Sequence, residues 1–163
     1  MKNCVRLLAG VLLFMLVAVA QAHALLVVGD SISAAYGLDT RLGWVALLQQ
    51  RLDEKGLSYQ VVNASISGDT TAGGRSRLPA LLEQHQPALV IIELGGNDGL
   101  RGLSLTAMQD NLAAMIAQAQ AQGARVLLLG MRIPPNYGPR YSEGFYQVYQ
   151  QLAAEQPVAL VDF

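Results

Sequence analysis

Short apolar runs alternate along this chain with longer segments of helical periodicity, and this alternation limits the folds that the chain can adopt. The runs are residues 25–28, 59–62, 88–94, 125–129 and 158–161. Strands that alternate with helices form parallel sheets, whose ligands bind beyond the carboxyl ends of the strands. The sequence therefore predicts an α/β fold: a doubly wound, flavodoxin-like sandwich around a five-stranded parallel sheet with right-handed crossovers.

The segments between the strands carry apolar residues at helical spacing. Pro79 predicts a break or restart in the second helix, because proline lacks the N–H that a helix interior uses. Thr106 and Gln109 have the spacing of a capping box, and Gly123 would end that helix. No repeat or linker divides the chain, so one domain is expected. The approximate helical spans are 44–52, 72–84, 106–123 and 141–155.

The N-terminus has the order of a secretory signal peptide. Lys2 and Arg6 precede an apolar run over residues 7–20, and small residues follow it. We expect residues 1–24 to be a signal peptide, cleaved after Ala22 or Ala24. An uncleaved anchor is the alternative, but the run is short for a membrane span of about 20 residues. The mature domain, residues 25–163, would then be periplasmic or secreted in a bacterium and have no stable membrane anchor.

Charge and cysteine content exclude several functions. The net charge of −1 gives no electrostatic case for nucleic-acid binding. The one cysteine, Cys4, lies in the predicted signal peptide, so the mature domain has no disulfide and no cysteine-based metal site. No glycine-rich phosphate-binding motif follows the first predicted strand, which argues against a nucleotide site. Nothing in the sequence argues against a monomer.

Three residues that follow neighbouring strands could form a catalytic site. Ser31 lies just beyond the first strand, where a helix can begin, and its hydroxyl could act as a nucleophile. Gly68 offers a free backbone N–H, and Asn97 offers a carboxamide after two glycines. Taken singly, Ser31 or Asp30 could merely cap a helix, and Gly68 and Asn97 could be turn residues. Together, at one edge of the sheet, they predict a nucleophile with an oxyanion hole.

These residues resemble the motifs of the SGNH, or GDSL, hydrolase family. Residues 29–31 resemble its first motif, Gly68 matches the glycine of its second, and residues 95–98 resemble its third. The resemblance extends over essentially the whole mature chain to one branch, the bacterial periplasmic multifunctional thioesterase I, lysophospholipase and arylesterase group. The segments most similar to that branch are residues 63–70, 93–102 and 134–138.

The resemblance implies a role for each of these residues. Ser31 would be the nucleophile, and the Ser31 N–H, the Gly68 N–H and the Asn97 side chain would form the oxyanion hole, with Asp30 and Asp98 in support. It implies hydrolysis of small-molecule substrates, namely acyl thioesters, aryl or short-chain esters and lysophospholipids, without a metal or an organic cofactor. Two loops that leave the same edge of the sheet predict further substrate-binding residues, which are Leu100, Pro135 and Tyr137.

The chain departs from the family at its last motif. That motif, Asp-x-x-His, supplies the base, and it does not occur in this sequence. His23 lies at the predicted cleavage site, and His85 precedes the third strand at the wrong end of the sheet. We therefore expect a chain truncated at Phe163, without its final helix, with exposed apolar surface and inactive on its own. An acyl-binding module without catalysis and an acetylesterase acting on envelope polysaccharides are the alternatives.

Overall fold

The structure of the protein is a computed structural model that describes residues 22–162. These residues form a sheet of five parallel strands in the order β2-β1-β3-β4-β5, with α-helices between them. The predicted doubly wound α/β fold is thereby confirmed. The strands are β1 His23–Gly29, β2 Tyr59–Asn63, β3 Leu89–Glu93, β4 Arg125–Leu129 and β5 Ala159–Val161. The helices are α1 Trp44–Glu54, α2 Thr71–His85, α3 Gly96–Leu100, α4 Leu105–Ala121 and α5 Pro139–Glu155, with short 3₁₀ turns η1 Thr40–Leu42 and η2 Pro135–Tyr137.

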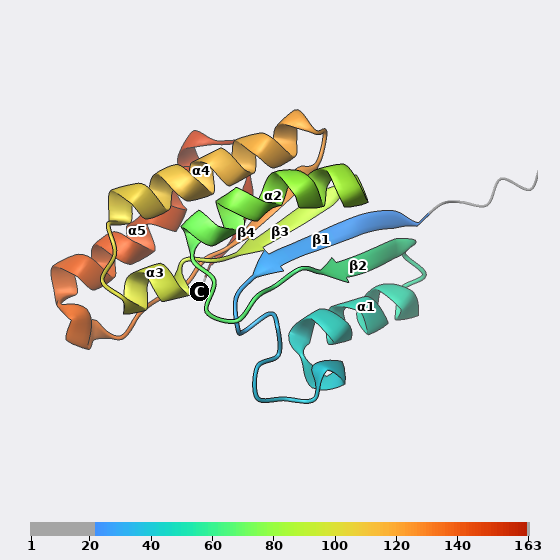
Figure 1. Ribbon diagram of the computed structural model, residues 1–163, viewed down its shortest axis with the longest axis horizontal. Coiled ribbons are helices and arrows are strands. Elements are labelled where there is room, and N and C mark those ends of the chain that lie inside the picture. The colour runs from blue at the N-terminus through green and yellow to red at the C-terminus, as the bar shows by residue number, and fades with distance from the viewer. Residues whose placement is uncertain (1–21, 163) are drawn as a thin grey trace, which may run out of the picture.

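Helices cover the sheet from both sides (Figure 1). One face carries α2, α4 and α5, and the other carries α1. The central strands β1, β3 and β4 are apolar over most of their length because both of their faces are buried, as is usual in parallel sheets. Their charged or polar residues stand at the strand ends, namely His23, Glu93 and Arg125. Helix α4 buries one stripe of side chains at helical spacing against its neighbours. That stripe consists of Met108, Leu112, Met115, Ile116 and Ala119.

Two predicted helix boundaries are wrong. Helix α2 runs without a break through Pro79, although proline removes one hydrogen bond and crowds the carbonyl four residues earlier; the buried Leu78 and Leu82 on either side pack this part of the helix against the core. Helix α4 begins at Leu105, and its cap is Ser104 rather than Thr106. The Ser104 hydroxyl accepts a 3.3 Å hydrogen bond from the N–H of Ala107. Thr106 therefore lies inside the first turn and has no capping role.

The strand order brings the loops of interest together. β1 lies between β2 and β3, and Gly29 at the end of β1 is in register with Glu93 at the end of β3. The chain leaves β1 toward β2 on one side and later adds β3 on the other. The loops after these strands therefore meet at the switch point of the sheet, where ligands bind in such folds.

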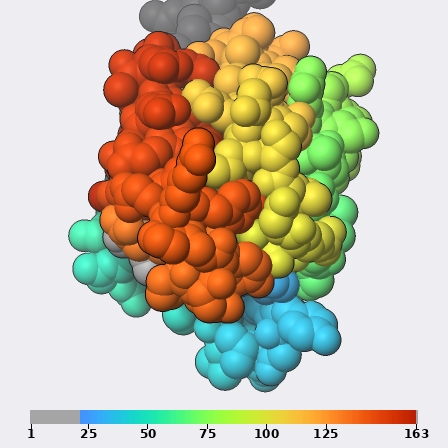
Figure 2. All heavy atoms as spheres, turned by 90° about the vertical axis from the view of Figure 1, so that its left-hand side faces the viewer, coloured from blue at the N-terminus to red at the C-terminus, as the bar shows by residue number. Residues whose placement is uncertain are grey.

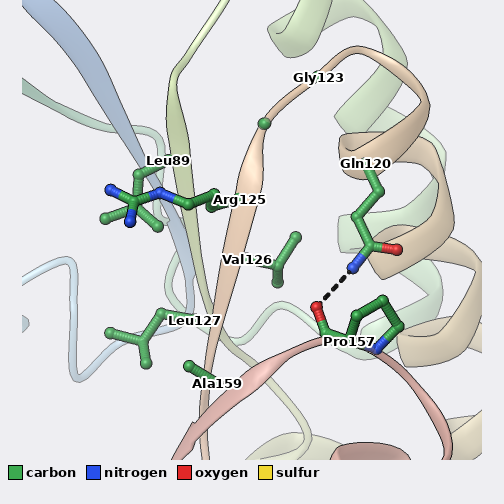
Figure 3. Close-up of a pocket in the computed structure, with 9 residues that line it drawn as sticks. Leu89, Gln120, Gly123, Arg125, Val126, Leu127, Pro157 and Ala159 are labelled. Carbon is green, nitrogen blue, oxygen red and sulfur yellow. Dashed lines mark hydrogen bonds between the residues drawn. The ribbon is translucent and has the colours of Figure 1, made fainter.

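The opposite edge of the sheet carries an apolar hollow between the amino ends of β3, β4 and β5 (Figure 3). Beside the hollow, Gln120 Nε2 donates a hydrogen bond to the carbonyl oxygen of Pro157 at 2.9 Å. Apolar surface is also exposed at the other end of the sheet, where the side chain of Val161 at the end of β5 is 52% exposed. Nothing in the lining of the hollow resembles a nucleophile or a base.

The predicted signal peptide lies almost entirely outside the described residues. Within residues 22–162, none of the helices has the length and hydropathy that crossing a membrane requires.

Candidate active site

The loop after β1 presents Ser31 in a series of turns. The expectation that a helix begins here is wrong, because residues 31–37 adopt turn conformations. The Asp30 carboxylate accepts a 3.0 Å hydrogen bond from the N–H of Ile32, and the Ser31 carbonyl accepts one from the N–H of Tyr36 at 3.0 Å. Ser31 is half-buried. Within residues 22–162, neither its N–H nor its hydroxyl has a hydrogen-bond partner.

Gly68 lies at the tip of the loop after β2. Its φ of +81° is in the left-handed region that favours glycine. The N–H of Ile66 donates a 3.0 Å hydrogen bond to the carbonyl of Gly29, which ties this loop to the end of β1. Like the N–H of Ser31, the Gly68 N–H has no hydrogen-bond partner among the described residues, while its carbonyl accepts from Arg101 at 2.9 Å.

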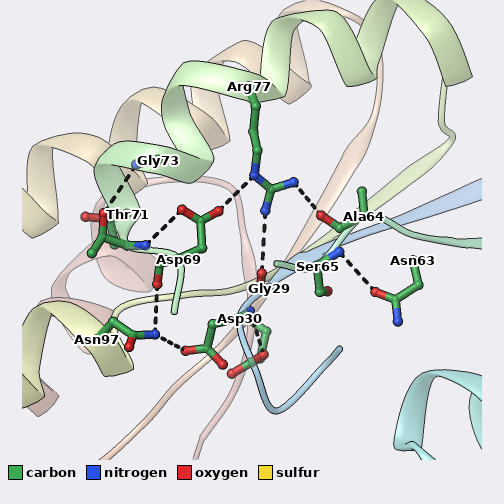
Figure 4. A network of polar contacts seen from close by, with 12 residues as sticks. Gly29, Asp30, Asn63, Ala64, Ser65, Asp69, Thr71, Gly73, Arg77 and Asn97 are labelled. Carbon is green, nitrogen blue, oxygen red and sulfur yellow. Dashed lines mark hydrogen bonds and ion pairs between the residues drawn. The ribbon is translucent and has the colours of Figure 1, made fainter. Parts of the chain in front are cut away.

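Asn97 belongs to a short helix, α3, that the sequence did not predict. Its side-chain nitrogen donates to the Asp30 carboxylate at 3.0 Å and to the carbonyl of Asp69 at 2.9 Å (Figure 4). One amide group thus connects the loop of Ser31 with the loop of Gly68. An amide nitrogen carries two hydrogens, and here both are already donated, one to Asp30 and one to Asp69. An oxyanion that binds this nitrogen therefore has to share one of the hydrogens or displace one of the two acceptors.

Asp98 does not point to the loop of Ser31. Its carboxylate is buried and accepts hydrogen bonds from the N–H of Thr71 at 2.9 Å and from the Thr71 hydroxyl at 2.6 Å. Asn111 also donates to the Thr71 hydroxyl, at 3.2 Å. Asp98 therefore fixes α3, the helix that carries Asn97, to the first turn of α2.

Glu93, the last residue of β3, was missed in the sequence. It is buried, and its Oε2 accepts hydrogen bonds from the Ser33 hydroxyl at 2.5 Å and from the N–H of Asp30 at 3.4 Å. Burial raises the pKa of Glu93 to about 7, and burial also raises the pKa of Asp30. The sequence did contain an indication of this residue, which is a carboxylate inside the otherwise apolar run 88–94. Buried charged side chains are rare unless they are paired, so a charge in such a run suggests a specific role.

Arg77, in the middle of α2, was also missed. Its guanidinium forms a 2.8 Å ion pair with Asp69 and donates to the backbone carbonyl of Ala64. The sequence does not indicate a buried role for Arg77, because an arginine on a helix is usually exposed to solvent.

The two histidines of the sequence lie away from Ser31, as expected. His23 begins β1 and His85 ends α2, and both line one polar pocket at the amino ends of the strands. Within residues 22–162, no imidazole therefore lies at the carboxyl edge. The same part of the chain holds no group of three or more histidine, cysteine or acidic side chains arranged for a metal ion.

The predicted substrate-binding residues lie on two segments that contact each other. The Tyr137 hydroxyl donates to the Leu100 carbonyl at 3.1 Å, and the Tyr141 hydroxyl donates to the Leu103 carbonyl at 2.7 Å. Leu100 is 51% exposed and Tyr137 is 37% exposed, and Pro135, at the start of η2, is exposed as well. Figure 2 shows these two segments, yellow and orange, on the face where the blue loop after β1 projects below them.

A serine at the switch point of a parallel sheet, whose own N–H and that of Gly68 have no hydrogen-bond partner within residues 22–162, is the arrangement expected of a serine hydrolase with an α/β fold. Residues 27–163 match the GDSL-like Lipase/Acylhydrolase family. The chain belongs to this family and is a carboxylic ester hydrolase.

Several relatives are similar over most of their length. The chain is 63% identical over 158 residues to Esterase TesA of Pseudomonas aeruginosa, which covers 96% of this chain and 79% of that relative. It is 50% identical over 160 residues to an arylesterase of Vibrio mimicus, and the match covers 98% of this chain and 80% of that relative. It is 47% identical over 144 residues to Thioesterase 1/protease 1/lysophospholipase L1 of Escherichia coli, and the match covers 88% of this chain and 68% of that relative. The crystal structure of TesA matches with a TM-score of 0.83 at 65% identity, covering 85% of this chain and 77% of that chain.

Proposed function

We propose that Ser31 attacks the acyl carbonyl carbon of an ester or a thioester and forms an acyl-enzyme. The Ser31 N–H, the Gly68 N–H and the Asn97 side chain hold the negative charge that develops on the carbonyl oxygen. The serine proton passes through a base to the leaving alcohol or thiol, and water then releases the acid. The observation that carries this proposal is that the N–H groups of Ser31 and Gly68 have no partner in the described part of the chain, while the Asn97 amide connects their two loops.

The substrates that we propose are acyl thioesters, aryl or short-chain esters and lysophospholipids. The names of the relatives from Pseudomonas, Vibrio and Escherichia support these classes. The acyl chain would lie against the exposed apolar surface of Leu100, Pro135 and Tyr137. A metal ion or an organic cofactor has no step in this mechanism.

The test compares the full encoded polypeptide with its Ser31→Ala variant on a series of p-nitrophenyl and acyl-thioester substrates. We expect Ser31→Ala to abolish turnover, and a fluorophosphonate probe to label only Ser31, as seen by peptide mass spectrometry. Ester binding without turnover would instead support an acyl-binding module. Turnover that collapses for every acyl chain longer than acetyl would support an acetylesterase.

We also propose that the protein is periplasmic and is released by cleavage after Ala22. β1 begins at His23, whose register partner is Tyr59, so this cut leaves the strand intact. A cut after Ala24 would remove two residues that pair with β2. Amino-terminal sequencing of the protein from a periplasmic extract distinguishes the two sites, and light scattering of that sample tests the proposed monomer.

A further inference from the structure

We infer that Arg77 is a positioning residue for the oxyanion hole, holding in register the loops that carry its donors. This inference rests on the proposed function of Ser31, Gly68 and Asn97. Arg77 does not touch the reacting atoms. Its side chain extends from α2 toward Gly29, Ala64 and Asp69 (Figure 4).

The Arg77 guanidinium donates to three acceptors on two segments, the end of β1 and the loop after β2. Its Nε donates to the Asp69 carboxylate at 2.8 Å, one terminal nitrogen donates to the Ala64 carbonyl, and the other donates to the Gly29 carbonyl at 3.5 Å. Gly29 is the end of β1, and Ala64 begins the loop after β2. The planar guanidinium presents its donors as a rigid fork, which allows one side chain to bridge several acceptors.

One partner of Arg77, Asp69, adjoins Gly68 and contacts Asn97, and a second, Gly29, lies two residues before Ser31. Asp69 follows Gly68 directly in the chain, and its carbonyl accepts the 2.9 Å hydrogen bond from Asn97. The same Asn97 nitrogen donates to Asp30, the neighbour of Ser31. A displacement of Asp69 is therefore expected to shift the Gly68 N–H and the Asn97 amide together.

The surrounding chain leaves Asp69 little freedom. The second oxygen of its carboxylate accepts a 3.0 Å hydrogen bond from the N–H of Thr70. A Cβ on Gly73 would collide with that same oxygen. The side chains of Arg77 and Asp69 are 21% and 11% exposed, so water screens this pair less than a surface ion pair. The contacts form a rigid support rather than a solvated salt bridge.

The test measures kcat and KM separately for Arg77→Gln and Arg77→Lys in the full encoded polypeptide, together with the rate of fluorophosphonate labelling. The matched control is Arg75→Gln, since Arg75 is an exposed arginine on the same helix that donates a 3.2 Å hydrogen bond to the Asn111 side chain. We expect Arg77→Gln to lower kcat about 10- to 100-fold, because small misplacements of catalytic groups have effects of that size. We expect KM to change less than about twofold, Arg77→Lys to be intermediate, and the control to match wild type.

Folding and function can be separated in this experiment. If Arg77→Gln does not fold, Gly73→Ala displaces the Asp69 carboxylate while Arg77 is retained, and the same loss in kcat is expected. A folded Arg77→Gln protein that turns over like Arg75→Gln would overturn the inference and leave the proposed function intact. Wild-type hydrolysis that survives Ser31→Ala would overturn the proposed function, and the inference with it.

Discussion

The Ser33 hydroxyl lies 2.5 Å from Glu93 Oε2, so a buried carboxylate at the end of β3 holds the loop that carries Ser31. Gly29 makes this contact possible. A Cβ at that position would lie 2.6 Å from Ser33 Oγ and 2.7 Å from Glu93 Oε2. The other carboxylate oxygen, Oε1, is buried without a hydrogen-bond partner among the described residues, which makes the charged form of Glu93 costly.

Glu93 should make the stability of the protein depend on pH. Its pKa of about 7 in the folded state lies above the ordinary value of 4.5, so the folded state retains a proton that the unfolded chain has lost. The contribution of Glu93 to the free energy of unfolding is therefore fully present below about pH 4.5 and is lost as the pH rises through about 7. Over that range the free energy of unfolding should fall by about 3 kcal/mol. Urea unfolding between pH 4.5 and 8 should show this fall in wild type and a smaller one in Glu93→Gln.

Other acidic groups near Glu93 have to be considered in that measurement. Asp30 faces it across the end of β1, Tyr149 approaches from α5, and Asp162 lines the same pocket at the end of β5. The pKa of Asp30 is also raised, so part of the pH dependence remains in the variant. Glu83→Gln, an exposed position on α2, is the control. A difference curve between wild type and Glu93→Gln that stays flat would show that folding does not raise the pKa of Glu93.

Asn97→Ala should lower kcat about 10²- to 10³-fold, which is the usual effect of removing one oxyanion donor. The variant also breaks the connection between Asp30 and Asp69, so steady-state kinetics should be accompanied by an unfolding curve. Asn136→Ala, at an exposed position in η2, is the matched control. Unchanged turnover in a folded Asn97→Ala protein would remove Asn97 from the mechanism.

Asp98→Ala should destabilise the fold by about 1–3 kcal/mol, because it leaves the N–H and the hydroxyl of Thr71 without their buried acceptor. A double-mutant cycle with Thr71→Val measures the coupling, and the exposed Asp110→Asn serves as control. If the effects of Asp98→Ala and Thr71→Val on unfolding simply add, the two side chains do not support each other.

The sequence predicted the parts of this protein that follow from periodicity and loop position. The five parallel strands, the buried stripe of α4 and the placement of Ser31, Gly68 and Asn97 after neighbouring strands needed only local patterns. The supporting contacts could not be predicted in this way. Glu93 and Ser33 are 60 residues apart, and Asn97 and Asp30 are 67 apart, so the fold alone brings them together. The helix α3 was missed because two glycines in its sequence indicate a turn.

The last prediction concerns the acyl-binding surface. Tyr137→Phe keeps the aromatic ring but removes the hydrogen bond to the Leu100 carbonyl, one of two tyrosine contacts that hold segments 100–103 and 134–141 together. Leu100 should then be held less firmly against an acyl chain. We expect KM for an octanoyl ester to rise several-fold while KM for the acetyl ester stays unchanged, because the short chain ends before it reaches this surface. Tyr59→Phe, at the start of β2, is the control. Equal effects on both esters would mean that Tyr137 acts on the site as a whole rather than on the length of the acyl chain.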